Sequence, residues 1–205
     1  AIQIYQAYVE RDMEADGTRY LEAALETEPE NAEDYCSRGR VYYYMQDYSN
    51  AQKELIEAVN SESTEALLLL GKVYLASEDI SNARAMYQEY AAAEGESAGG
   101  YNGLALCDIA EGNYSSALTN ISTGLPLADQ EEMQELLFNE IVAYESLLDF
   151  STARQKVIEY LALYPDDEAA QKELVFLNSR TGNTSDSENS SEENTQESVP
   201  QETEE

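Results

Sequence analysis

The chain has 205 residues, with 42 acidic and 11 basic side chains, two cysteines and no histidine. A formal net charge of −31 argues against direct binding of nucleic acid or of an anionic membrane, because both need Lys and Arg. Without histidine, the usual general base, Ser-His nucleophiles and His-ligated metal sites are excluded. We therefore predict no catalytic residue, no cofactor and no metal site. No run of about 18 apolar residues is present, so no membrane-inserted segment is predicted.

Three columns of residues repeat along the chain in one irregular register. In every column the successive steps are 34, 32, 34 and 36 residues. A period near 34 residues fits two helices and two turns, and such units must stack because one unit cannot bury its own apolar face. The columns are Tyr8, Tyr42, Tyr74, Asp108 and Tyr144; Gly17, Ala51, Ala83, Ala117 and Ala153; and Ala24, Ala58, Tyr90, Gly124 and Tyr160.

The register places the helix hairpins in chain order. We predict units near 1–31, 32–63, 64–97, 98–133 and 134–167, followed by a capping helix over 168–180. The small second column indicates close helix crossings, and the residues four positions later (Leu21, Leu55, Tyr87, Ile121, Val157) extend a buried stripe. Asp47, Asp79, Asn113 and Asp149 lie where a polar side chain would cap the second helix of a unit.

The remaining segment, 181–205, differs sharply in composition from the repeats. It is rich in Ser, Glu, Asn, Thr and Gln, has no base, and holds eight of the 42 acids, which leaves 34 acids against 11 bases in the repeats. Such a segment cannot bury enough apolar surface to offset its conformational entropy, so we predict a disordered acidic tail. Cys36 and Cys107 lie two repeats apart, too far for an undistorted disulfide, and are predicted to be packing residues.

These columns resemble the tetratricopeptide repeat (TPR) family. Leu70-Gly71, Tyr74, Ala83 and Tyr87 of the third unit carry its pattern well. Other units depart from it, since the chain has no Trp and Asp108 stands where the family has Tyr. The resemblance covers about residues 1–165 and implies an all-α, right-handed superhelical solenoid of about five hairpins plus the cap.

The resemblance also implies a binding groove, because first helices of successive repeats line a concave surface in this family. Arg40 and Lys72 hold the same position in adjacent repeats, where they could grip a carboxylate. The alternative is that both bases only pair with neighbouring acids such as Glu33 and Glu65. The predicted partner-binding residues are Arg40, Tyr43, Tyr44, Leu68, Lys72, Leu75, Asn102, Leu106, Ile109, Phe138 and Asn139.

The expected function is a non-enzymatic scaffold or adaptor that binds a protein or peptide segment. Two alternatives remain: a chaperone-like holdase for a secreted or assembling partner, and a non-catalytic fragment of a larger enzyme or membrane-anchored protein. An exposed stripe of Ile2, Ile4, Tyr5 and Tyr8 could form a homodimer through the first repeat. The start at Ala1 within a helix pattern and the polar tail favour an extracytoplasmic or anchored setting in a bacterium, with a cytoplasmic one as the alternative.

Overall fold

The computed structural model of the chain describes residues 1–182. Within them the secondary structure is eleven α-helices and one 3₁₀ helix, without strands, so the all-α prediction is confirmed. Of the predicted tail, 183–205 lie outside the described residues, whereas Thr181 ends the last helix. The helices are α1 Ile2–Val9, α2 Glu14–Ala24, α3 Ala32–Tyr44, α4 Tyr48–Asn60, α5 Glu65–Ala76, α6 Ile80–Glu94, α7 Ala98–Ala110, α8 Tyr114–Gly124, η1 Leu125–Leu127, α9 Gln130–Ser146, α10 Phe150–Leu163 and α11 Glu168–Thr181.

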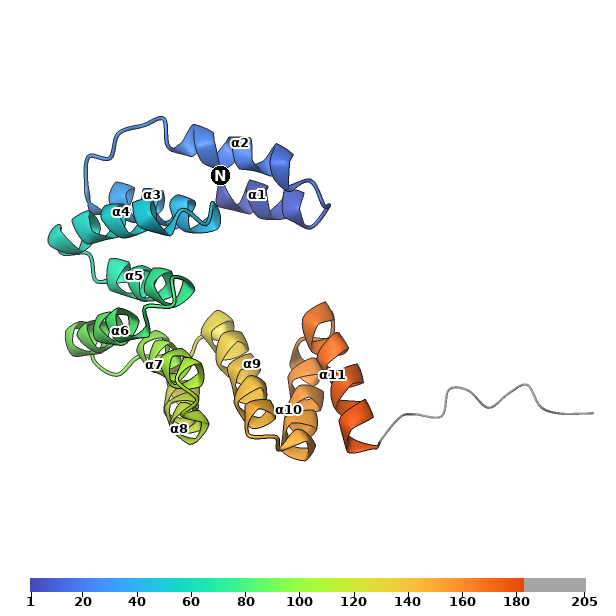
Figure 1. Cartoon of the computed structure of the whole chain (residues 1–205). Helices are drawn as coiled ribbons and strands as arrows, with labels where there is room; N and C mark the ends of the chain where they lie inside the picture. Colours follow the sequence, from blue (N-terminus) through green and yellow to red (C-terminus); the bar gives the residue numbers. More distant parts are fainter. Residues whose placement is uncertain (183–205) are drawn as a thin grey trace, which may run out of the picture.

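Consecutive helices pair into antiparallel hairpins that follow one another along an arc, from α1 and α2 at one end to α11 at the other (Figure 1). The first three predicted units each enclose one hairpin. The boundary predicted between 133 and 134 is misplaced, because it falls inside α9. That helix starts early because Asp129 and Glu132 form a capping box directly after the 3₁₀ turn containing Pro126.

The second column packs as its small side chains predict. Ala51, Ala83, Ala117 and Ala153 are fully buried. At Gly17, the equivalent position of the first hairpin, an added Cβ would lie 3.0 Å from Cβ of Tyr8. The helices of a hairpin therefore cross too closely for a larger side chain.

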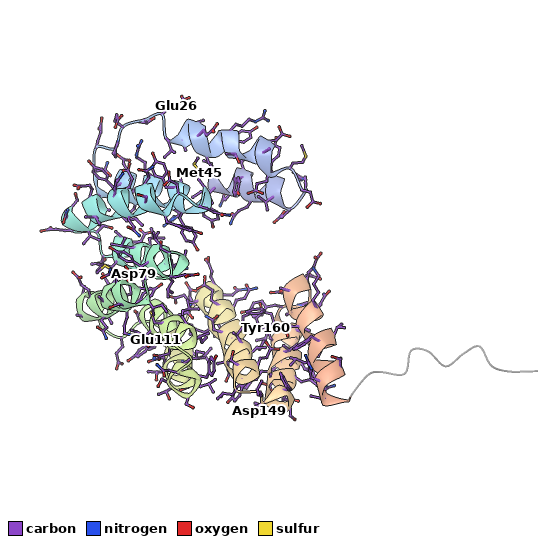
Figure 2. The ribbon with its side chains drawn as sticks, viewed as in Figure 1. Glu26, Met45, Asp79, Glu111, Asp149 and Tyr160 are labelled. Atoms are coloured by element: carbon purple, nitrogen blue, oxygen red, sulfur yellow. The ribbon has the colours of Figure 1, made fainter. Side chains whose placement is uncertain are left out.

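The turn inside each hairpin has a feature that the sequence pattern did not reveal. Asp47, Asp79 and Asp149 accept the predicted backbone N–H bonds, whereas Asn113 makes no side-chain cap bond. Asp79 and Asp149 mark two of these turns in Figure 2. In each of the five hairpins, the residue before the N-cap position of the second helix has positive φ. These residues are Asp12, Gln46, Glu78, Gly112 and Leu148, of which only one is glycine.

Asp108, which departs from the aromatic column, is buried at the junction of α6, α7 and α8. Its two carboxylate oxygens accept hydrogen bonds from Arg84 Nη2 and from Asn120 Nδ2, each at 2.8 Å. Arg84 Nη2 also lies 2.9 Å from Glu111 Oε2. A charged network thus replaces an aromatic contact at this junction.

The first hairpin packs against α3. This packing affects the stripe of Ile2, Ile4, Tyr5 and Tyr8 that was predicted to form a homodimer. Tyr5 is buried beside Leu21 and Val41, and the ring of Tyr8 lies 5.6 Å from that of Tyr20. Ile4 stays largely exposed. The prediction of an exposed stripe of four residues is therefore wrong, because intramolecular packing buries Tyr5 and leaves Tyr8 half-buried.

The other end of the array is closed by α11. Ala170 and Leu177 are buried against α10, and Arg154 Nε donates to Asn178 Oδ1 at 2.6 Å. The helix ends at Thr181, one residue beyond the predicted cap, because Gly182 takes a left-handed conformation. None of the helices in 1–182 combines the length and apolarity needed to span a bilayer.

Candidate functional site: a groove on the concave face

A cavity of about 820 Å³ lies between α5, α7 and α9. Leu75, Leu106 and Phe138 give it an apolar wall, and Tyr43 of α3 closes one side. Its remaining lining residues are Lys72, Ala76, Glu131, Gln134, Glu135, Asn139, Tyr160, Asp167 and Ala169.

Three further cavities adjoin the first. Those of about 210 Å³ and 710 Å³ share Lys72, Glu131 and Glu135 with it, and that of about 610 Å³ shares Tyr43. Because neighbouring cavities share lining residues, the four follow one another from α1 to the start of α11, and together they are called the groove. Its floor comes mainly from the first helices of the hairpins, as the sequence resemblance implied.

Ten of the eleven predicted partner-binding residues line the groove. Ile109 does not, because it packs against the buried cluster of Ala105, Ala117, Ile121 and Leu136 where α7, α8 and α9 meet. Ile109 is therefore a half-buried packing residue that does not line these four cavities.

Both bases in the groove already have acidic partners within the chain. Arg40 donates to Glu65, and Lys72 Nζ lies 3.5 Å from Glu135 Oε1. The alternative of local pairing thus holds for both, although Lys72 uses Glu135 rather than one of the acids that the sequence suggested. The Lys72 and Glu135 side chains are 43% and 46% exposed, so water screens this pair and it contributes little stability.

Two asparagines join α7 and α9 beneath these charges. Asn139 Nδ2 donates to Asn102 Oδ1 at 2.7 Å, and Asn102 Nδ2 donates to Glu135 Oε2 at 2.8 Å. Asn102 is buried, so these bonds satisfy polar atoms that would otherwise be costly. The network fixes the Glu135 carboxylate at the centre of the groove.

The C-terminal end of the groove is formed by Gln134, Tyr160 and Asp167, of which Tyr160 belongs to the third repeating column. The Tyr160 hydroxyl, on the side chain labelled in Figure 2, donates to Asp167 Oδ2 at 2.6 Å. It also accepts from Gln134 Nε2 at 3.0 Å. Burial raises the pKa of Tyr160 to about 12, and the bond from Tyr160 lowers the pKa of Asp167. Tyr160 therefore stays neutral and Asp167 stays charged near neutral pH.

Tyr87 reaches the groove from the outer helix α6. Its ring passes between α5 and α7, where added Cβ atoms at Gly71 and Gly103 would lie only 2.6 Å and 2.2 Å from it. The side chain is buried, yet its hydroxyl has no hydrogen-bond partner among the described residues. Burial raises the pKa of Tyr87 strongly, so the hydroxyl remains protonated. The stripe position of Tyr87 predicted its burial but not its access to the groove.

The cysteines lie buried and unpaired, as packing residues would. Burial raises the pKa of Cys107 to about 11 and that of Cys36 above its ordinary value, so neither is a reactive thiolate near neutral pH. Over residues 1–182, no three acidic or cysteine side chains gather in a way that could hold a metal ion.

No family model and no curated protein sequence matches the chain. Among solved structures, a chain of the APC/C Cut9–Hcn1 hetero-tetramer matches with a TM-score of 0.69 at 14% identity, over 86% of this chain and 35% of that one. A tetratricopeptide repeat protein from Parabacteroides merdae matches with a TM-score of 0.62 at 14% identity, over 89% of this chain and 72% of that one. A thermophilic TPR protein from Thermus thermophilus matches with a TM-score of 0.64 at 19% identity, over 74% and 84%.

This chain therefore spans about a third of the length of the Cut9–Hcn1 match. At such identities the likeness shows the fold, which is the tetratricopeptide-repeat fold that the three columns predicted.

Proposed function

We propose that this chain, having the tetratricopeptide-repeat fold, is a non-enzymatic scaffold that binds a segment of a partner protein in its groove. The observation that carries the proposal is the extension of the groove across several hairpins. An extended or helical segment needs such a length of surface, with apolar pockets for anchoring side chains and polar groups that fix its register.

The apolar wall of the groove's largest cavity is the expected anchor. Leu75, Leu106 and Phe138 come from three successive first helices and converge on one space. Aromatic rings of Tyr43 and Tyr160 border that space, so a large apolar side chain could be enclosed on several sides.

The proposal can be tested without a known partner by selecting a displayed library of random dodecapeptides on the immobilised chain. Affinities of synthetic copies of the selected peptides are then measured by fluorescence anisotropy. Leu106→Ala should weaken binding about tenfold, since it removes part of the anchor pocket. Leu163→Ala is the matched control, because Leu163 is 61% exposed on α10 and lies outside the groove.

Two results would contradict the proposal. One is the absence of any enriched peptide that binds the free chain in solution. The other is enriched peptides whose affinity is the same for wild type, Leu106→Ala and Leu163→Ala, which would place binding outside the groove.

A further inference from the structure

The smallest cavity of the groove, about 210 Å³ between α5, α7 and the start of α9, is strongly acidic. Asp129, Glu131, Glu132 and Glu135 line it, against the single base Lys72. Asp129 and Glu132 serve the capping box of α9, and Glu135 pairs with Lys72 and Asn102. Part of this charge is thus explained by helix capping, which favours acids in a first helical turn.

Two groups in the cavity are left without a partner in the described part of the chain, although Glu131 also stands in the first turn of α9. The exposed Glu131 side chain has no basic partner within residues 1–182. The buried hydroxyl of Tyr87 has no hydrogen-bond partner there either, although an orphaned buried polar group is unfavourable. A positive charge would pair with the Glu131 carboxylate, and an N–H donor that reached the Tyr87 oxygen would give that atom the partner it lacks.

The walls of the cavity suit the side chain of a basic residue. Leu68 and Leu106 give it apolar sides, and the carboxylates of Glu131 and Glu135 lie on its lining as well. Lysine and arginine combine an apolar stem with a charged tip and could use both kinds of surface. The cavity also shares Lys72, Leu106, Glu131 and Glu135 with the large apolar cavity, so residues adjacent in one peptide could occupy the two.

We propose that this cavity receives a lysine or arginine side chain of the partner segment, next to an apolar residue held by Leu75, Leu106 and Phe138. The proposal rests on the proposed function, because it specifies the chemistry of the segment in the groove. The exposed Lys72 contact with Glu135 is weak enough for a partner cation to compete with it. The charge excess of the whole chain favours approach of the same basic segment.

The test uses the peptides selected on the wild-type chain. Enriched sequences should share a Lys or Arg beside an apolar residue, and replacing that base with norleucine should weaken binding about tenfold. The double variant Glu131→Gln/Glu135→Gln should cause a similar loss and flatten the salt dependence of binding. The control Glu57→Gln/Glu62→Gln removes the same charge from exposed positions outside the groove and should change affinity less than twofold.

Tyr87→Phe separates a binding role from a structural one. It removes only the unpartnered hydroxyl, so it should raise the thermal midpoint of unfolding. It should nevertheless weaken the basic peptides severalfold and leave their norleucine versions unaffected.

Enriched peptides without basic residues, or affinities that are equal for wild type and Glu131→Gln/Glu135→Gln, would overturn this inference and leave the proposed function standing. A selection that yields no binding peptide would overturn both.

Discussion

Replacing Asp108 tests whether a buried charged network can stand in for an aromatic repeat position. The Asp108 side chain is 8% exposed and joins Arg84 of α6 to Asn120 of α8. Removing one partner of a buried ion pair typically costs 3–5 kcal/mol, because the other charge remains uncompensated. Here Arg84 is 26% exposed and keeps Glu111 at 2.9 Å, so we expect a loss of about 2–3 kcal/mol for Asp108→Ala.

The assay is urea unfolding followed by the far-ultraviolet circular dichroism of the helices, analysed by linear extrapolation. Asp166→Ala is the control, since Asp166 is an exposed acid outside the network. The double variant Arg84→Met/Asp108→Leu replaces both charged partners with apolar side chains and should recover much of the loss. A cost below about 1 kcal/mol for Asp108→Ala, or a double variant no more stable than Asp108→Leu alone, would refute this account of the junction.

Three other predictions concern backbone strain, protonation and packing. Leu148→Gly should raise the thermal midpoint of unfolding by relieving up to about 1 kcal/mol of left-handed strain, because Leu148 has φ of 61° and is 73% exposed; an unchanged midpoint would argue against strain. Burial and the neighbouring Glu173 raise the pKa of Glu145 to about 8, so the folded chain keeps a proton that the unfolded chain loses. Stability should therefore fall as pH rises from about 5 to about 8, by about 1 kcal/mol after allowing for partial exposure, and Glu145→Gln should remove this fall in urea titrations at each pH. Gly103→Ala should lower the free energy of unfolding by about 1–3 kcal/mol, because its Cβ would lie 2.2 Å from the Tyr87 ring. In calorimetry, adding Tyr87→Leu should cancel part of that loss. Strictly additive losses would exclude the clash.

The sequence was sufficient for the fold because the packing signals recur in register. A buried alanine such as Ala51 or Ala117 reports the same helix crossing in each hairpin, so independent columns support one another. The left-handed turn residues recur in the same register, but their side chains carry no common signal. Gln46 and Leu148 share a conformation with Gly112 and have no chemistry in common. The left-handed conformation is a requirement of the backbone, and different side chains tolerate it. The identity of the side chain therefore does not reveal it.

Individual site residues were less predictable because they depend on contacts between repeats. Ile109 has the spacing of a groove residue, yet the cluster around Leu136 takes it into the packing between α7, α8 and α9. Tyr87 has the spacing of a core residue, yet the glycines at 71 and 103 let its ring pass between two helices to the groove. Both outcomes are decided by the neighbouring hairpin, which a single repeat pattern does not describe.

The structure changes the functional argument most at the electric charge of the groove. From the sequence, Arg40 and Lys72 suggested a grip for an acidic partner, since they are aligned bases in a chain with few of them. In the structure Glu65 and Glu135 already neutralise them, and Glu131 adds a carboxylate that no base balances among residues 1–182. An acidic segment would have to displace both internal carboxylates and approach a chain of net charge −31. A basic segment meets neither obstacle, so the unbalanced carboxylate, rather than the aligned bases, indicates the charge of the partner.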